Sequence, residues 1–337
     1  MKSSSVIKVK LVFLKVMLVT CAFLQNAGAS GDQYISVSNL NPFSIGLDQG
    51  NAYSSSSFTN KNYAIDLKLE IGNFSKQSTS GNEEIILDGE TYKTTFYFYY
   101  GFNGQWQGSM SIPHIRHSSG LLDNVIEQWH DMAGLSNSRR SSFSSNRLHY
   151  EFLENGVSQV HVVNSVGGIG DINLALSYTP LSWQDKDNIR LINLDFKLPT
   201  GDPDRLTGNG AADLGLSVSL MKKNLFGSHR LTMTNGLGLK LHGEGKVLPL
   251  KQKGISYSLH SGIHWRPVKE LTLSSQLALH SAYFESDLDE LGKASTQLLL
   301  GGSFHVEDDM KCQFTLGENL FTDATPDLSL HIVVQLK

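Results

Sequence analysis

The sequence predicts an all-β protein: a transmembrane, antiparallel, up-and-down β-barrel of about fourteen strands, with twelve as the alternative count. Three observations predict it. Apolar and polar residues alternate in many short segments, the chain begins with a secretory signal, and the connections between segments are alternately long and short. A soluble multi-sheet protein would not need that rhythm of connections.

The C-terminal segment, residues 326–337, is the clearest strand. Leu328, Leu330, Ile332, Val334 and Leu336 share one face of an extended chain, and the other face is mostly polar. A tilted strand of about ten residues spans the hydrocarbon layer of a bilayer. Outer-membrane barrels end on such a strand, which pairs with the first strand and removes the open edge. A half-buried strand of a soluble sandwich would look the same, so the rest of the chain decides.

The same alternation recurs along the chain. Residues 63–71 place Asp66, Lys68 and Glu70 on one face and apolar side chains on the other, as a wet lumen or a sheet surface requires. Further alternating segments lie near residues 92–100, 106–112, 148–152, 158–164, 172–178, 192–198, 214–220, 231–241, 255–265, 271–283, 298–306 and 310–316, of which 158–164 is the least regular.

The connections form two sets if the amino terminus starts in the periplasm. The external set is residues 75–84, 114–146, 166–170, 200–211, 243–253, 285–293 and 320–326; the periplasmic set is residues 102–105, 154–156, 179–188, 223–228, 266–267 and 306–309. The external set is generally longer, which is typical of bacterial barrels with an even number of strands. The external connection 166–170 is short and the periplasmic connection 179–188 is long, so both break this rhythm. A count of twelve strands therefore remains an alternative. Aromatic residues near strand ends fit interfacial girdles: Tyr63, Tyr100, Tyr178, Trp265 and Tyr283.

Residues 1–29 have the features of a signal peptide: a lysine-rich start, a short apolar core and the small residues Ala27, Gly28 and Ala29 before a cleavage site. We therefore expect export through the inner membrane, cleavage after Ala29 and a place in the bacterial outer membrane. Residues 30–60 are polar, contain N-L-N-P-F at 39–43, and are interpreted as a periplasmic N-terminal lead-in. Residues 61–337 form the predicted outer-membrane barrel.

The charge balance and the cysteine content limit the classes of partner that the chain can have. Four of the 28 basic residues lie in the signal peptide, so the mature chain is more acidic than the formal net charge of −4. That balance argues against a nucleic-acid partner, which calls for a basic face. Cys21 leaves with the signal, so Cys312 has no partner for an intrachain disulfide. The expected partners are outer-membrane lipid, the barrel-assembly machinery and small solutes.

The longest predicted external loop, residues 114–146, contains one short amphipathic helix. Leu122, Val125, Ile126 and Trp129 follow helical spacing. We expect the helix to fold inward, bury Trp129 and narrow the mouth of the barrel, with folding over the rim as the rival arrangement. The candidate constriction residues are Asp123, Glu127, Trp129, His130, Asp131, Arg139 and Arg140.

Several stretches resemble an uncharacterised Gram-negative outer-membrane β-barrel family, domain of unknown function 3187. They are N-L-N-P-F (39–43), D-G-E-T-Y (88–92), H-S-S-G-L-L-D-N-V-I-E-Q-W-H-D-M-A-G-L (117–135), G-G-I-G-D-I (167–172), K-L-P-T-G (197–201) and P-D-L-S-L (326–330). The loop-helix stretch is the most specific. Two departures are the C-terminal Lys337, where barrels usually end on an aromatic residue, and Asn137-Ser138. The resemblance implies an outer-membrane barrel and no established activity.

No catalytic motif stands out. The chain has no G-x-S-x-G, no H-E-x-x-H and no Cys pair, and we assign no catalytic, cofactor-binding or metal residues. Glu127, His130 and Asp131 have a spacing that suits metal ligation or acid–base chemistry, but such residues more often solvate a helix or anchor a loop. The lumen-facing candidates are Asp66, Lys68, Glu70, His260, His264, His280 and His305.

These features favour a porin-like channel or small-solute transporter. The alternatives are a membrane-embedded enzyme of the lipid hydrolase type, which needs Ser, His and a polar orienting group within hydrogen-bonding reach, and a structural or adhesive barrel acting through its loops. The sequence does not demand an enzyme.

Overall fold

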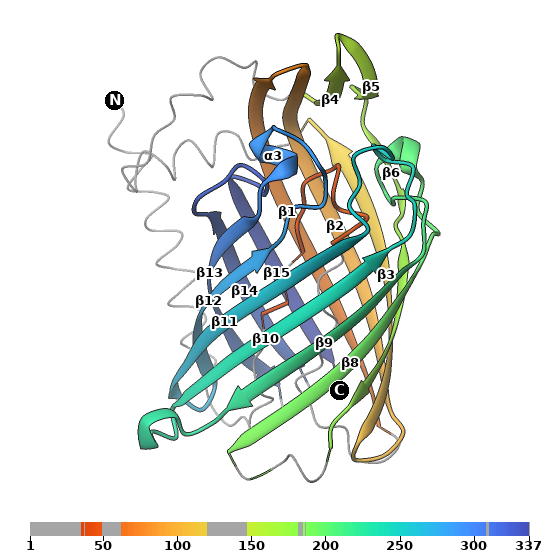
Figure 1. Cartoon of the computed structure of the whole chain (residues 1–337). Helices are drawn as coiled ribbons and strands as arrows, with labels where there is room; N and C mark the ends of the chain where they lie inside the picture. Colours follow the sequence, from red (N-terminus) through yellow and green to blue (C-terminus); the bar gives the residue numbers. More distant parts are fainter. Residues whose placement is uncertain are drawn as a thin grey trace, which may run out of the picture.

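The computed structural model describes residues 35–36, 38–48, 62–119, 147–180, 185, 187–307 and 310–336. Within them the chain is almost entirely antiparallel strand (Figure 1). Twelve strands form a closed ring, because β2 pairs with both β1 and β3, and β3 pairs in turn with β7. The structure therefore selects the smaller of the two expected strand counts. Closure removes the open edges, so every ring strand has two neighbours.

The ring strands follow one another up and down. They are β1 (Tyr63–Ser80), β2 (Glu83–Gly101), β3 (Trp106–Ser118), β7 (Ile172–Tyr178), β8 (Asn188–Leu198), β9 (Asp213–Lys222), β10 (Leu231–His242), β11 (Ile255–Val268), β12 (Leu271–His280), β13 (Ser295–Glu307), β14 (Met310–Asn319) and β15 (Leu328–Leu336). The last strand pairs with the first, with Ile65 opposite Leu336 and Asn73 opposite Leu328.

Alternation along each strand sorts side chains between the two faces of the wall. Phe98 and Leu300 point outward and are 40% and 52% exposed. Lys68, Glu70 and Gln297 point inward and are buried. An apolar outer face around a polar inner face is the arrangement of a barrel in lipid. Among the described residues, no helix has the length and hydrophobicity to cross a bilayer.

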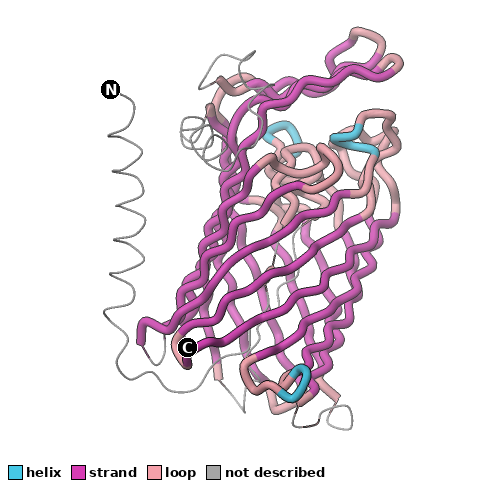
Figure 2. The backbone as a smooth tube through the Cα atoms, turned by 90° about the vertical axis from the view of Figure 1, so that its left-hand side faces the viewer, coloured by secondary structure: helices cyan, strands magenta, loops and turns pink. Residues whose placement is uncertain are grey.

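The two ends of the barrel differ (Figures 1 and 2). One end, here the loop end, carries the described residues 147–171 and the connections 199–212, 243–254, 281–294 and 320–327, with the 3-10 helix η3 (Pro203–Arg205) and the helical turn α3 (Asp289–Gly292). The opposite turn end carries shorter connections, one of which contains η4 (Leu225–Gly227), together with the start of β1 and the end of β15. Bacterial barrels place their long loops outside the cell.

Two expected spanning strands, near residues 148–152 and 158–164, are not part of the ring, and a third short strand lies in the expected external connection 166–170. β4 (His149–Glu154) pairs with β5 (Val157–Val162) and with residues 83–88 of β2, and β6 (Val166–Ile169) pairs with the loop-end half of β3. The turn at residues 155–156, expected in the periplasm, therefore lies at the loop end. The physical reason is length, since strands of four to six residues are too short to cross a bilayer.

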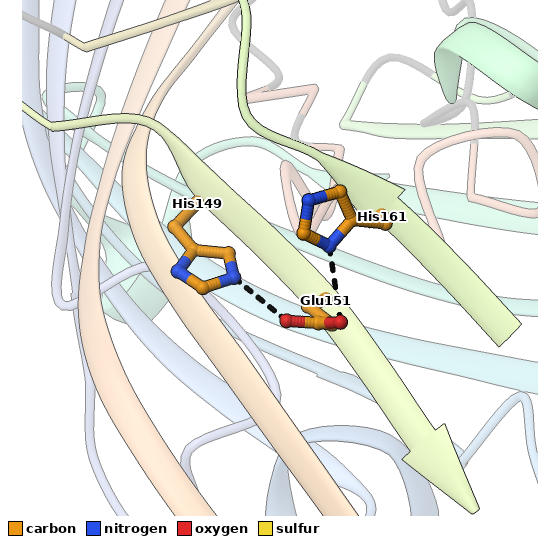
Figure 3. Close-up of side chains that lie close together, drawn as sticks. All are labelled: His149, Glu151 and His161. Carbon is orange, nitrogen blue, oxygen red and sulfur yellow. Dashed lines mark hydrogen bonds and ion pairs between the residues drawn. The ribbon is translucent and has the colours of Figure 1, made fainter. Parts of the chain in front are cut away.

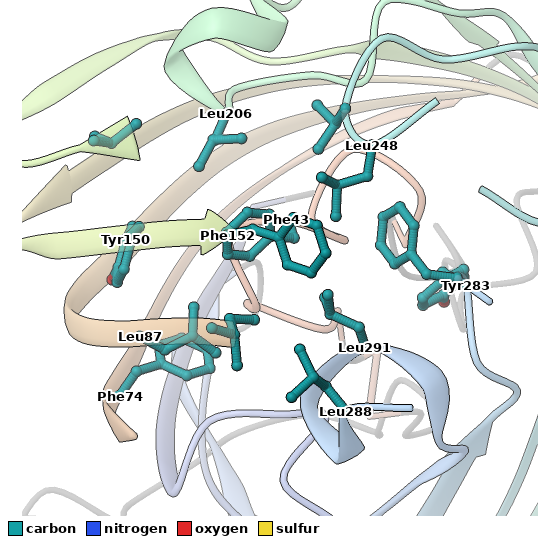
Figure 4. Close-up of a cluster of buried hydrophobic side chains, with 14 of the residues drawn as sticks. Phe43, Phe74, Leu87, Tyr150, Phe152, Leu206, Leu248, Tyr283, Leu288 and Leu291 are labelled. Atoms are coloured by element: carbon teal, nitrogen blue, oxygen red, sulfur yellow. The ribbon is translucent and has the colours of Figure 1, made fainter. Parts of the chain in front are cut away.

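Apolar side chains fill the mouth at the loop end (Figure 4). They come from β1, β2, the β4–β5 hairpin and three loops: Phe74, Ile85, Leu87, Leu148, Tyr150, Phe152, Val162, Leu206, Val247, Leu248, Tyr283, Phe284, Leu288 and Leu291, joined by Phe43 and Leu47 from the N-terminal segment. Burying each such side chain contributes about 1.5–3 kcal/mol. Tyr283, expected in an aromatic girdle, lies in this mouth cluster instead. Tyr63, Tyr100 and Trp265 are exposed on the outer face.

Candidate functional site

Residues 35–48, without residue 37, form a plug inside the ring. Backbone carbonyls along the plug accept hydrogen bonds from three separated wall strands: Ile35 from Gln276 of β12, Ser36 from Lys68 of β1 and Gly46 from Lys197 of β8. We expected residues 30–60 to be a periplasmic lead-in; the described part lies in the lumen. The reason is hydrophobic, since Leu40, Phe43, Ile45 and Leu47 need burial and are each at most 2% exposed.

The N-L-N-P-F stretch gives the plug its turn. The side-chain carbonyl of Asn39 accepts from the backbone N–H of Asn41 at 2.9 Å, and that of Asn41 accepts from Phe43 at 3.1 Å. Asparagine forms such turns readily because its side chain mimics a backbone group. The side-chain amides then reach loop-end carbonyls, Asn39 donating to Ala324 at 3.0 Å and Asn41 to Glu290 at 3.0 Å. The two asparagines thus shape the plug and fasten it to two loops.

A charged row on β2, β1 and β15 holds the start of the plug. The register places Glu70 opposite both Lys93 and His331. Ser38 of the plug donates to the Glu70 carboxylate at 2.9 Å and accepts from Lys93 at 3.0 Å. Lys68 lies 2.8 Å from Glu70 and His331 lies 3.1 Å from it. A buried carboxylate is tolerated because cations and donors surround it.

A second charged row on β8, β9 and β10 holds the end of the plug. The register places Lys197 opposite Asp213 and Asp213 opposite His242. The Lys197 ammonium lies 2.8 Å from Asp213 and 3.2 Å from Asp171, and it donates to the carbonyl oxygen of Gly46 at 2.6 Å. Replacing buried ion pairs with apolar groups is often neutral for stability, whereas removing one partner is costly. These rows therefore specify where the plug sits.

The plug approaches the wall too closely for a side chain at Gly46. A Cβ there would lie 2.5 Å from the backbone nitrogen of Asn209 and 2.8 Å from the carbonyl carbon of Gly208. Asn209 donates its own backbone N–H to Asp171, so this loop is held against the same charged row. The glycine is needed for close approach of two backbones.

A cavity of about 80 Å³ remains beside the plug, against β9 to β13. Plug residues Ile35, Leu47 and Asp48 line one side of it, and Ser256 and His280 belong to the wall side. The hydroxyl of Ser256 lies 2.8 Å from Nε2 of His242, and Nδ1 of that ring lies 3.1 Å from Asp213. This Ser–His–Asp series has the hydrogen-bond order of a hydrolase triad.

A similar series lies at the other charged row. Ser329 is 2.9 Å from Nε2 of His331, whose Nδ1 is 3.1 Å from Glu70. All three side chains are at most 2% exposed, and the carboxylate already binds Lys68 and the plug. This second series therefore supports the wall and plug rather than facing an open space.

An ion network at the loop end holds the β4–β5 hairpin and a loop against the start of β2. Lys251 pairs with Glu83 at the start of β2 and lies 3.0 Å from Glu154 at the end of β4. Burial alone would raise the pKa of Glu83, but hydrogen bonds from Lys251, Ser286 and the Asp287 backbone lower that pKa below its ordinary range. The hydrogen bond with Glu83 raises the pKa of Lys251. The network joins the start of β2, the β4–β5 hairpin and the loop of residues 243–254.

The lumen-facing candidates predicted from sequence lie on the inner side of the wall. Asp66 accepts from Gln335 at 2.9 Å, and Lys68 and Glu70 contact the plug as described. His280 lies 3.0 Å from the side-chain nitrogen of Asn39. His264 lies 2.9 Å from both Thr234 and Ser274. His260 and His305 share the inward strand positions of β11 and β13. The three charged candidates Asp66, Lys68 and Glu70 therefore all lie on β1, and the four histidines are distributed over β11 to β13.

The candidate constriction residues of the loop helix lie outside the described residues: Asp123, Glu127, Trp129, His130, Asp131, Arg139 and Arg140. Their inward fold stays a prediction. The mouth cluster shows that other loops fold inward at this end.

The chain matches the family described as "Protein of unknown function (DUF3187)" over residues 11–337. It belongs to this family. A comparison with curated proteins gave no match.

The fold of this DUF3187 chain is similar to the COG4313 outer membrane channel from Pseudomonas putida F1, with a TM-score of 0.52 and 9% identity over 83% of this chain and 96% of that one. It is also similar to the NanC porin, with a TM-score of 0.43 and 11% identity over 81% and 99% of the two chains. For the CymD monoaromatic hydrocarbon channel the TM-score is 0.38 and the identity 12%, over 88% and 90%. At 9% identity the likeness to the COG4313 channel shows the fold alone, that of an outer-membrane barrel.

Three of the stretches that resemble the DUF3187 family meet at the plug. N-L-N-P-F is part of the plug, G-G-I-G-D-I supplies Asp171 and K-L-P-T-G supplies Lys197, both at the end of the plug. Asp327 of P-D-L-S-L pairs with Lys76 at 2.8 Å. Sequence reasoning did not assign a site to Asn39, Asn41, Asp171 or Lys197. Their positions in these stretches were the available signal.

Proposed function

We propose that this DUF3187 protein is an outer-membrane channel for small solutes that residues 35–48 keep closed, and that opening requires the plug to move. It would reach the outer membrane after cleavage near Ala29. The observation that carries the proposal is a closed ring with an apolar outer face and a chain segment lodged in its polar lumen.

The contacts of the plug support movement rather than permanent closure. In its described residues the plug contributes no strand to the wall and is held by side-chain hydrogen bonds, ion-dipole contacts and packing. Water and solute can replace hydrogen bonds to Ser38 and Gly46 at small net cost, because a typical intramolecular hydrogen bond contributes only about 0.5–1.5 kcal/mol. The ring would keep its own ladder when the plug leaves.

Single-channel recording in planar bilayers tests this function. We expect the mature chain to show low conductance, and a variant lacking residues 35–48 to show a stable, larger conductance and faster solute uptake by liposomes. A milder variant, Asn39→Ala with Asn41→Ala, removes two loop anchors and should open more often than wild type. Asn82→Ala with Asn103→Ala changes two exposed asparagines and is the matched control. Equal conductance in all correctly folded variants would exclude gating by the plug.

A second candidate function rests on Ser256, His242 and Asp213. In an acyl transfer, the Ser256 hydroxyl would attack an ester carbonyl carbon while Nε2 of His242 takes its proton. That proton then passes to the leaving alkoxide, and water repeats the sequence to release the acid. Asp213 would hold the imidazole through Nδ1. The neighbouring N–H of Tyr257 already donates to Ser281 at 3.0 Å, so this amide is not free to stabilise an oxyanion.

Labelling with a fluorophosphonate probe distinguishes the proposed enzyme from the proposed channel. An activated Ser256 should be labelled, and Ser256→Ala should abolish labelling while Ser258→Ala, which changes a serine lining the same cavity, should leave it intact. The variant lacking residues 35–48 gives the probe access to the cavity. Absence of labelling in that variant would assign the three residues to the support of the wall.

A further inference from the structure

The β4–β5 hairpin has two unlike faces. Tyr150, Phe152 and Val162 point into the mouth cluster and are buried. Because side chains alternate along strands, His149 and Glu151 of β4 lie on the opposite face. Figure 1 shows β4 and β5 at the loop end, beyond the barrel wall. Among the described strands, β5 pairs with β4 alone and is therefore an edge strand.

The strand register adds a third side chain to that face. Glu151 lies directly opposite His161 of β5, and His149 lies two residues before Glu151. Nε2 of His149 is 2.8 Å from one carboxylate oxygen, and Nδ1 of His161 is 3.0 Å from the other. Figure 3 shows the two rings directing these nitrogens at the carboxylate from two strands. Among the described residues, these three are the group of His, Cys, Asp and Glu side chains whose ligand atoms all lie within 4.8 Å of one another.

We propose that His149, Glu151 and His161 bind a divalent transition-metal ion, with Zn²⁺ as the reference ion. Two imidazoles and one carboxylate are an established zinc donor set, which leaves a fourth position for water or another ligand. Zinc–ligand bonds of about 2.0–2.2 Å place tetrahedral ligand atoms roughly 3.3 Å apart. The observed 2.8 and 3.0 Å separations are close to that spacing, so small side-chain rotations are sufficient.

The three side chains are partly accessible to a cation. Those of His149 and Glu151 are 20% and 13% exposed. The His161 side chain is 50% exposed, which gives an ion a path from solvent.

The site crosses from β4 to β5 next to an irregularity. The register shifts between Phe152 and Leu153, because Phe152 faces Val160 and Leu153 faces Ser158. Bulges of this kind weaken a two-stranded ladder locally and redirect side chains. A metal ion bound across the Glu151–His161 pair would restrain the hairpin. Since the reverse face contributes Tyr150 and Phe152 to the mouth cluster, bound metal would also hold the cover of the mouth in place.

Isothermal titration of the full mature barrel with Zn²⁺, after chelator treatment and without a histidine tag, tests the site. We expect one equivalent to bind to wild type. Glu151→Gln should weaken that binding at least tenfold, and His149→Ala with His161→Ala should abolish it. His229→Ala changes an exposed histidine in a turn-end connection and should bind as wild type does.

Hydrogen exchange of wild type with and without Zn²⁺ keeps the test independent of variant folding. Bound metal should slow exchange at residues 149–162 and leave β10 and β11 unchanged. A hydrogen-bonded triad without metal affinity would show neither the single equivalent nor the slowed exchange. Equal binding by wild type and the double-alanine variant would also overturn the proposal, because the ion would then bind elsewhere.

Discussion

The ammonium of Lys197 donates to the carbonyl oxygen of Gly46 at 2.6 Å, and this contact joins the barrel wall to the plug. The same ammonium lies between the carboxylates of Asp171 and Asp213. The wall partners remain when the plug leaves, so Lys197 keeps compensating charges in both states. The plug is thereby attached to a prebuilt ionic row, and its departure does not strand a buried cation.

Gly46→Ala should displace the plug without removing a hydrogen-bonding side chain. The added Cβ would meet backbone atoms of Asn209 and Gly208 at 2.5 and 2.8 Å, and backbone cannot rotate away as a side chain can. We expect higher single-channel conductance with unchanged heat modifiability of the barrel on gels. Gly254→Ala is the control, because nothing lies within 4 Å of its added Cβ. A closed Gly46→Ala channel would show that the loop at 208–209 yields instead of the plug.

Lys197→Met should destabilise the barrel. It leaves two buried carboxylates near each other and removes the donor to Gly46, and breaking a buried ion pair costs roughly 3–5 kcal/mol. Urea unfolding in detergent, followed by tryptophan fluorescence, measures the change. Lys222→Met alters an exposed lysine on β9 and should have little effect. Adding Asp213→Asn to Lys197→Met should recover part of the loss, since it removes one of the opposed charges. No recovery would assign the loss to altered packing.

The β4–β5 hairpin should loosen in acid through Glu83. The folded-state pKa of Glu83 lies below its ordinary 4.5, so its stabilising contribution is complete above pH 4.5 and is lost as pH falls through the folded value. The folded-state pKa of Lys251 lies above its ordinary 10.5, so its contribution is complete below pH 10.5 and is lost as pH rises through the folded value. The contact is therefore constant between those limits.

Hydrogen-exchange protection factors for residues 149–154 measure this effect. They should be constant above pH 4.5 and fall in wild type as the pH drops from 4.5 through the lower folded value of Glu83. Lys251→Met should show low protection already at pH 5 and little further change. If both proteins lost protection in parallel, other carboxylates would be responsible.

Local pattern predicted the wall well because the inner and outer environments of a barrel repeat every second residue. The alternation in residues 63–71 predicted Lys68 and Glu70 on the polar face, and in the structure both are buried on the inner side of the wall. The same pattern overestimated the strand count, because alternation in β4 and β5 reflects a hairpin with one apolar face. Their length of six residues each was the signal against spanning.

The plug could not be predicted in the same way. Residues 35–48 have no strand or helix period, and their place depends on contacts with residues more than thirty positions away, such as Ser38 with Glu70. The signal was present but weak: Leu40, Phe43, Ile45 and Leu47 are apolar residues in a polar segment and require something to pack against. Likewise, the row from Lys197 to His242 exists only once the registers of β8, β9 and β10 are known.

The outer face should show a depth-dependent cost for charge. Leu300 lies midway along β13 and is 52% exposed, whereas Val306 lies near its turn end and is 45% exposed. If lipid covers this face, Leu300→Arg should destabilise the barrel by roughly 2–4 kcal/mol and Val306→Arg by about 0–1 kcal/mol. Folding titrations into lipid vesicles provide the measurement, with Leu300→Ala separating the loss of apolar area from the cost of charge. Equal costs at the two positions would mean that the hydrocarbon layer is not centred on the middle of β13. A cost near zero at both would mean that this face borders water.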